Sequence, residues 1–227
     1  RRSRTGAAAF ALCAMPRGDE EAPAPEAKRR RDQDGALGLP EAGAGGDRSP
    51  PLPLAAAGVV HLLAMGDSLT AGGFGSEPYP AQLEAMLNRE FASDAGSFRV
   101  HNAGICGETT EEMVERLPSE LEDLEREGVR PAFVLILGGT NDMGSSPPEE
   151  ILSNLTKLRG MAVAAGARPV MITIPRTDCG LSPVARVVNR RLHAEAAEDP
   201  SSLLADISGV AEERLSDGVH FDSEGYG

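Results

Sequence analysis

Short apolar runs alternate with longer amphipathic stretches from residue 58 onward. The first amphipathic stretch places Leu83, Met86, Leu87 and Phe91 on one face of a helix. Such alternation predicts an α/β fold, a three-layer α/β/α sandwich with a central parallel sheet. Strands are expected at 59–65, 98–102, 132–137, 169–174 and 203–207. Helices are expected at 79–91, 109–127, 148–165 and 183–197, with the second kinked or divided by Pro118.

The first 57 residues lack this pattern. They consist largely of Ala, Gly, Pro and Arg, with few bulky apolar side chains to offset the entropy of ordering. We therefore expect a disordered tail at 1–57 and one folded domain at 58–227. Residues 1–14 resemble a signal peptide, whereas a start at Met15 would leave them outside the native protein, and both alternatives stay open. The basic cluster at 28–31 has acidic neighbours and is expected to be a solvated run.

The acidic composition narrows the classes of partner. The chain has 22 Lys and Arg against 35 Asp and Glu, a net charge of −13, and the excess lies in 58–227. A domain of this charge repels nucleic-acid phosphates and anionic membrane surfaces. No apolar run reaches the length of a transmembrane helix.

The three cysteines and four histidines show neither a disulfide framework nor the spacing of a metal site. Cys13 lies in the tail, and a pair between Cys106 and Cys179 stays open. Few cysteines favour a reducing compartment, so a cytoplasmic location is slightly favoured over a secreted one. We expect neither a metal nor an organic cofactor.

Four polar segments follow the ends of predicted strands. Ser68 follows the first strand, Gly104 the second and Asn141 the third, whereas Asp217 and His220 come after the last. Because the carboxyl ends of parallel strands lie at one edge of a sheet, these segments are expected to converge on one cleft.

These residue types form the set that acyl transfer requires. A serine hydroxyl is a poor nucleophile unless a base accepts its proton, and His220 is the candidate base for Ser68. Asp217 lies three residues before His220 and can orient the imidazole. The backbone N–H groups of Ser68 and Gly104 and the side-chain amide of Asn141 can bind the oxyanion that forms.

Four short blocks carry a resemblance to the SGNH hydrolases, also called GDSL esterases or lipases. They are Gly-Asp-Ser-Leu at 66–69, Asn-x-Gly-x-x-Gly-x-Thr at 102–109, Gly-Thr-Asn-Asp at 139–142 and Asp-x-x-His at 217–220. The blocks occur in the family's order, and each lies at or after the end of a predicted strand. The run Gly-Asp-Ser-Leu-Thr-Ala-Gly resembles the small esterase, thioesterase and lysophospholipase branch.

The resemblance implies a flavodoxin-like fold and hydrolysis of carboxylic esters, or of thioesters, through an acyl-serine intermediate. It assigns the nucleophile to Ser68, the base to His220, the orienting acid to Asp217 and the oxyanion hole to Gly104 and Asn141. It implies no cofactor, and we expect a monomer that acts on a small-molecule ester. Acyl lipids, thioesters and acetylated sugars all stay open as substrates.

Neighbouring polar residues are expected to have structural roles. Asp67 and Asp142 should brace loops by hydrogen bonds, Cys106 should fill space beside the site, and residues 108–112 should form a solvated helix start. Asn141 could instead cap the helix that follows it.

Two alternatives concern the domain as a whole. The rival function is a non-catalytic domain that binds an acyl group or an acetylated glycan without turnover. The resemblance also implies a closing helix from about residue 223, and only five residues remain there. We expect the domain to lack this helix and to leave part of the sheet uncovered.

Overall fold

Five parallel strands form the centre of the unit that runs from residue 51 to residue 227. The computed structural model describes residues 58–72, 77–178, 180, 182–199, 202–210, 212–222 and 224–225. The expectations for the tail, for the signal-like stretch and for a pair between Cys106 and Cys179 lie outside these residues in whole or in part.

The strands follow the spatial order β2-β1-β3-β4-β5. Gly66, at the end of the first strand, pairs with Gly104 on one side and Leu137 on the other. Three strands therefore end level at one edge of the sheet. The strands are β1 (Val59–Gly66), β2 (Ser97–Gly104), β3 (Phe133–Leu137), β4 (Arg168–Ile172) and β5 (Leu203–Ala205). All five overlap the runs that the sequence predicts.

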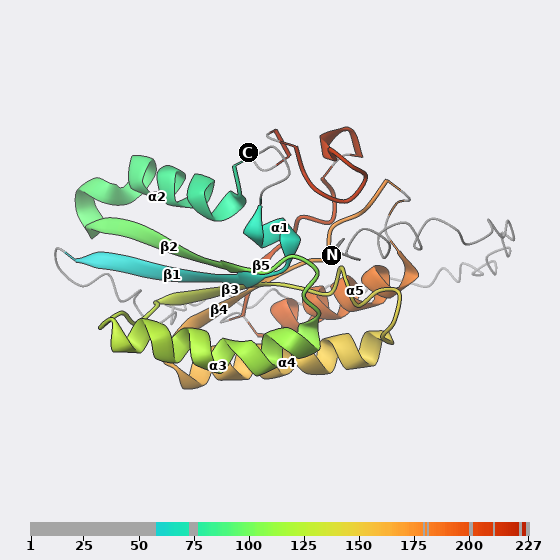
Figure 1. The fold of residues 1–227 in the computed structure, drawn as a ribbon, viewed down its shortest axis with the longest axis horizontal. Helices are drawn as coiled ribbons and strands as arrows, with labels where there is room; N and C mark the ends of the chain where they lie inside the picture. The colour runs from blue at the N-terminus through green and yellow to red at the C-terminus, as the bar shows by residue number, and fades with distance from the viewer. Residues whose placement is uncertain are drawn as a thin grey trace, which may run out of the picture. The chain divides into compact units, whose positions relative to one another are not determined.

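Helices cover both faces of this sheet, which confirms the three-layer α/β/α sandwich (Figure 1). In Figure 1, α3, α4 and α5 lie below the sheet, and α1, α2 and the C-terminal segment lie above it. The helices are α1 (Ser68–Ala71), α2 (Tyr79–Ala95), α3 (Thr110–Arg126), α4 (Pro148–Ala164) and α5 (Pro183–Glu198). A 3₁₀-helix at Glu212–Arg214 precedes the last loop.

The longer helices begin where the sequence has start signals. A capping box opens α3, since Thr109 and Glu112 bond each other's backbone N–H groups. Both α4 and α5 have proline in the first turn, where a missing N–H costs nothing. Pro118 does not divide α3, because the helix continues from Thr110 to Arg126 with Leu117 and Leu124 anchored in the core.

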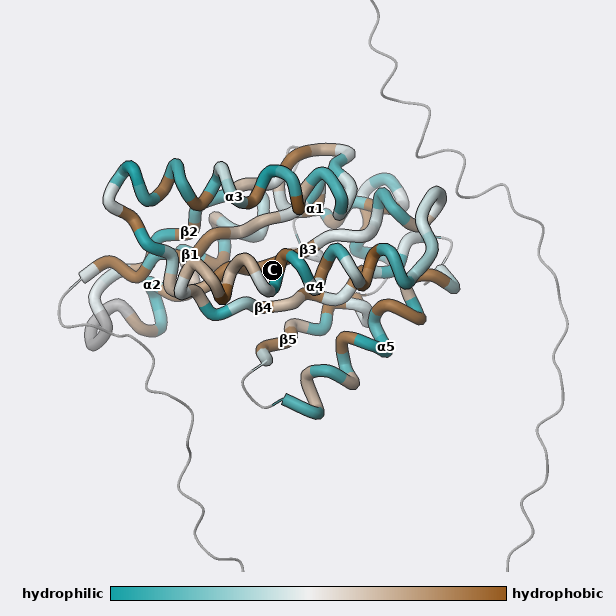
Figure 2. Tube along the Cα trace, turned by 90° about the horizontal axis from the view of Figure 1, so that it is seen from below, coloured by the Kyte–Doolittle hydropathy of each residue, from teal (hydrophilic) through white to brown (hydrophobic). Residues whose placement is uncertain are grey.

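Side chains of alternating strand residues pack into two separate hydrophobic cores, one on each face of the sheet. Leu63 and Ile136 belong to the core under α3, α4 and α5, whereas Leu62 and Leu135 belong to the core on the α2 side. Figure 2 shows hydrophilic and hydrophobic residues interleaved along the helices below the sheet, as expected of amphipathic helices with one buried face.

The α2 side of the sheet contains an apolar cavity of about 550 Å³. Its walls come from α2, from strands β3, β4 and β5, and from the last loop. Leu69 and Phe221, the neighbours of Ser68 and His220 in sequence, both line it. The cavity lies on a sheet face close to the C-terminal segment, and the expectation that the domain lacks a closing helix stays a prediction.

Candidate active site

The turn between β1 and α1 presents Ser68 at the carboxyl edge of the sheet. β1 is buried along its last residues, and α1 begins at Ser68 directly after the turn. Asp67 caps this short helix, because its Oδ1 accepts from the N–H of Leu69 at 2.9 Å. The cap fixes the backbone on both sides of Ser68.

The loop after the 3₁₀-helix brings Asp217 and His220 together. Asp217 Oδ1 accepts from the backbone N–H groups of Val219 and His220, at 3.1 and 2.8 Å. Gly218 has φ of +88°, a conformation that an L side chain rarely adopts. Its carbonyl oxygen accepts from the N–H of Asp178 at 2.8 Å, which ties the turn to the segment after β4.

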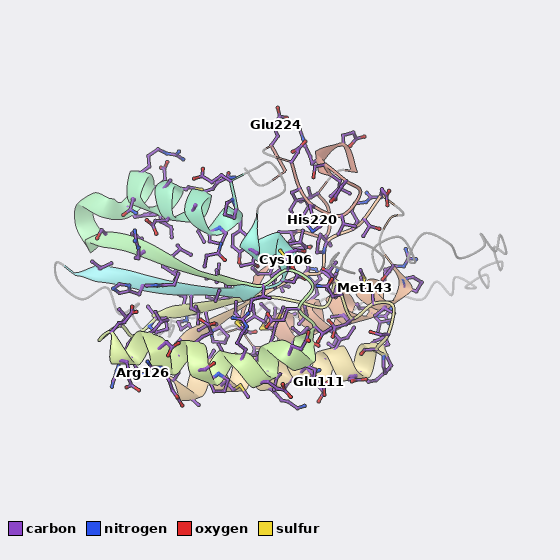
Figure 3. All side chains as sticks on the ribbon, viewed as in Figure 1. Cys106, Glu111, Arg126, Met143, His220 and Glu224 are labelled. Carbon is purple, nitrogen blue, oxygen red and sulfur yellow. The ribbon has the colours of Figure 1, made fainter. Side chains whose placement is uncertain are left out.

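Two further hydrogen bonds join the three side chains in a row. Asp217 Oδ2 lies 2.7 Å from His220 Nδ1, and His220 Nε2 lies 2.8 Å from Ser68 Oγ. Figure 3 shows His220 at the α1 end of the sheet. In such a row an imidazole can accept a hydroxyl proton on one nitrogen while a carboxylate holds the other.

The environment of Asp217 favours its charged form. Partial burial acts to raise the pKa of Asp217, but the hydrogen bonds from the backbone and ring of His220 and from the N–H of Val219 outweigh it. The net effect is a pKa below the ordinary aspartate value, so the carboxylate stays ionised beside the imidazole.

Gly104 packs directly against α1. A Cβ at this position would lie 2.1 Å from the backbone nitrogen of Ala71, so no larger residue fits without movement. The Gly104 N–H donates to Asn102 Oδ1 at 3.0 Å. This donor is therefore close to the helix that carries Ser68, but is occupied by a neighbouring side chain.

Asn141 lies in the turn after β3 and does not cap the following helix. The N-cap of α4 is Pro147. Asn141 Nδ2 donates to the carbonyl oxygen of Glu108 at 2.9 Å, and one of its two N–H groups is thereby used. Within the described residues, neither Asn141 nor Gly104 hydrogen-bonds to Ser68. A role of these two residues in oxyanion binding therefore requires contact with the substrate and not with Ser68.

Two expectations about the neighbouring loop were wrong. Glu108 is not part of a solvated helix start: it precedes α3, is 6% exposed, and pairs with Arg116. Cys106 does not fill space beside the site but is exposed, and Figure 3 shows it at the same end of the sheet as His220. Arg116, one of two arginines in a glutamate-rich helix, is the signal in the sequence for the first error.

Asp67 and Asp142 brace the loops, as the sequence predicts. Asp142 accepts from the backbone N–H of Thr110 at 3.1 Å and from its hydroxyl at 2.6 Å. Burial raises the pKa of Asp142 despite these bonds. Asp67, which precedes Ser68 in the sequence, is fully buried, and burial raises its pKa to about 7.

Two other histidines pair outside the Ser68 row. His101 Nε2 lies 2.9 Å from His61 Nδ1, and His193 pairs with Asp206. In the part of the chain that the structure describes, no three His, Cys, Asp or Glu side chains are grouped as a metal site requires. None of the described helices combines the length and apolar character needed to cross a membrane.

Comparison with known proteins identifies the family. The sequence profile of the GDSL-like lipase/acylhydrolase family matches residues 64–227, which include every residue of the proposed site. The chain belongs to this family. As a GDSL-family protein, it is an SGNH-type hydrolase of esters.

Two curated relatives of this GDSL hydrolase are esterases. The esterase TesA of Pseudomonas aeruginosa is 29% identical over 164 residues, which cover 70% of the chain and 78% of the relative. An arylesterase of Vibrio mimicus is 34% identical over 114 residues, covering 50% of the chain and 54% of the relative. The acetylxylan esterase Axe2 of Geobacillus stearothermophilus shares the fold, with a TM-score of 0.58 and 22% identity over 75% of the chain and 90% of that structure.

Proposed function

We propose that this GDSL hydrolase cleaves carboxylic esters through an acyl-enzyme formed on Ser68, with His220 as general base and Asp217 as its orienting acid. The observation that carries the proposal is the unbroken row of hydrogen bonds from Asp217 Oδ2 through the imidazole to Ser68 Oγ, at 2.7 and 2.8 Å. Geometry of this kind is what activates a serine hydroxyl.

The reaction has two halves. In the first, Ser68 Oγ attacks the ester carbonyl while His220 Nε2 takes the hydroxyl proton, and collapse of the tetrahedral intermediate passes that proton to the leaving alcohol. In the second, water loses a proton to His220 and attacks the acyl-serine carbonyl. The acid product departs and Ser68 regains its proton, so the enzyme returns to its starting state.

The N–H groups of Ser68 and Gly104 and the side chain of Asn141 are proposed to bind the oxyanion. First-turn N–H groups lack acceptors within their helix, which suits the N–H of Ser68 to this task. Gly104 fits because it packs against α1. Its N–H must leave Asn102 Oδ1 or share its hydrogen when the oxyanion forms.

Uncharged esters are the proposed substrate class. The curated relatives are named esterase and arylesterase. Beside the Gly104 loop, Glu112 and Glu115 line a shallow hollow, and their charges disfavour an anionic substrate there. Esters whose acyl part and alcohol or phenol part carry no charge therefore fit this edge of the molecule better than anionic esters.

Labelling with a fluorophosphonate probe tests the nucleophile. The native protein should become labelled at Ser68, and the Ser68→Ala variant should not, because only an activated hydroxyl attacks the phosphorus centre. Label elsewhere, or equal label in both proteins, would overturn the assignment.

A substrate panel tests the class. p-Nitrophenyl esters of rising acyl length should be hydrolysed, with an aryl acetate, an acetylated sugar, a lysophospholipid and an acyl thioester in parallel arms. A rate confined to the thioester, or to an anionic substrate, would contradict the proposal.

A further inference from the structure

Arg116, on α3, directs its guanidinium at the loop from Gly104 to Glu108, here called the 104–108 loop. The Arg116 side chain is 16% exposed and that of Glu108 is 5% exposed. Arg116 Nε and Nη2 donate to the two carboxylate oxygens of Glu108, both at 2.6 Å. Two parallel bonds between arginine and a carboxylate fix the relative orientation of both groups.

The same guanidinium holds the other end of the loop. Arg116 Nη2 also donates to the carbonyl oxygen of Ala103 at 2.8 Å, immediately before Gly104. A fourth bond, from Nη1 to Glu120 at 2.8 Å, steadies the guanidinium from its own helix. One side chain therefore clamps the 104–108 loop at both ends.

Glu108 extends this clamp to Asn141. Its carbonyl oxygen accepts from Asn141 Nδ2 at 2.9 Å, while its carboxylate is held by Arg116. Displacing the Glu108 side chain therefore shifts the acceptor that orients the Asn141 amide. The same partly buried ion pair therefore contacts the residue before Gly104 and the residue that accepts from Asn141.

The chemistry of the pair makes it a rigid support. Hydrogen bonds from Arg116 to Glu108 are the main reason that the pKa of Arg116 is raised, so the guanidinium keeps its charge. Removal of Arg116 leaves the buried carboxylate of Glu108 without this compensating charge, and the loop must open to hydrate it. Lysine cannot replace the fork, because it has no second donor in a fixed plane.

We propose that Arg116 is a positioning residue for the oxyanion hole: through Glu108 and Ala103 it sets the places of Asn141 and Gly104. The inference rests on the proposed function, since it assumes that these two groups bind the oxyanion. It assigns Arg116 no contact with the substrate.

The test measures kcat per active site, with the sites counted by fluorophosphonate titration, so that misfolded protein does not enter the rate. Arg116→Gln should lower kcat about 10- to 100-fold, less than the loss of a whole oxyanion donor, with KM within about 2-fold. Arg116→Lys should fall between this variant and the native protein. The matched control is Arg126→Gln, on the same helix, whose side chain is 73% exposed and pairs with Asp123; its kcat should not change.

Glu108→Gln provides a second variant should Arg116→Gln fail to fold, because it keeps the side-chain shape and one acceptor oxygen. It should lower kcat per site by several-fold or more. Unchanged kcat per titrated site in the folded Arg116 or Glu108 variants, or an effect on KM alone, would overturn the inference. Ser68→Ala separates the two proposals: if it retains activity, the proposed function fails; if it is inactive while Arg116→Gln is unimpaired, only the positioning role fails.

Discussion

At the scale of single residues, the three side chains of the proposed triad depend on each other. The Ser68 hydroxyl is a poor nucleophile without His220 as its base, and His220 has no hydroxyl proton to accept without Ser68. The 2.8 Å contact between them is the one link between the start and the end of the described domain that the mechanism uses directly. Variants at these positions should therefore behave as changes to one unit.

Ser68→Ala and His220→Ala should each lower kcat for a p-nitrophenyl ester by about 10⁴- to 10⁶-fold, and the double variant should be no slower than the worse single one. Steady-state kinetics on all three proteins measures this. If Ser68→Ala keeps more than about a tenth of the native rate, the nucleophile is a different residue.

Asn141→Ala should lower kcat by about 10²- to 10³-fold with little change in KM, because the oxyanion exists only in the transition state. The same assay checks it. A change in KM alone would mean that Asn141 contacts the substrate in its ground state, and would remove it from the oxyanion hole.

The buried carboxyl of Asp67 predicts that stability falls as the pH rises from about 4 to about 7. Burial raises the pKa of Asp67 from 3.8 to about 7 in the folded protein. Between these values the folded state holds a proton that the unfolded chain has lost, so raising the pH favours unfolding. The upper limit of this contribution is about 4 kcal/mol, from about 1.4 kcal/mol per pH unit.

Asp67→Asn keeps an acceptor for the N–H of Leu69 and removes the titration. The melting temperature of the variant relative to the native protein should therefore rise between pH 5 and pH 8. Thermal unfolding of both proteins at each pH measures the difference. A difference that stays constant over this range would contradict the prediction.

At the scale of elements, the sequence predicts β1 and β3 well because most of their residues are buried on both faces of the sheet. The run at 59–65 is apolar except for His61, and β1 differs from it by one residue at its end. α1 was not predicted, since four residues are too few to show a helical period. The carboxyl ends of parallel strands lie at one edge of a sheet, which is why the sequence predicts that Ser68, Asp217 and His220 come together.

Contacts between elements could not be predicted in the same way. Nothing local to Glu108 indicates burial; its partner, Arg116, lies on a helix whose packing decides the pair. The bond from Gly104 N–H to Asn102 depends on the backbone path of two residues in a loop. Such features follow from the tertiary structure and not from periodicity.

Gly104→Ala tests the packing of β2 against α1. The added Cβ would lie 2.1 Å from the nitrogen of Ala71 and 2.6 Å from its Cα, and neither is a flexible side-chain atom. The strain should cost about 1–3 kcal/mol and lower the melting temperature by roughly 3–10 °C, with a loss of activity because α1 carries Ser68.

The matched control is Gly160→Ala, inside α4, where an added Cβ meets nothing within 4 Å. That variant should be as stable as the native protein or slightly more so, because alanine favours helix. Thermal unfolding and ester hydrolysis on the three proteins decide the matter. Equal melting temperatures for Gly104→Ala and the native protein would show that α1 can move aside.

At the scale of the whole molecule, the two sides of the sheet are covered unequally. The side under α3, α4 and α5 includes several residues with no exposure, Ile136, Leu158 and Val188 among them. The α2 side has the apolar cavity over β3, β4 and β5. A net charge of −13 opposes association of such molecules through their apolar surfaces, and the monomeric state stays a prediction.

The distance along the chain between the two halves of the site has a kinetic consequence. Ser68 and His220 are 152 positions apart, and parallel pairings of β1 with β2 and β3 require shorter closures than the one that brings the last loop to Ser68. During refolding from denaturant, the far-ultraviolet dichroism of sheet and helices should recover first. Ester hydrolysis should return in a slower phase, as the final loop docks onto an otherwise assembled sheet. The rate at which ester hydrolysis recovers would then report the rate of the last folding step. Simultaneous recovery of dichroism and hydrolysis would show that the loop docks together with the strands.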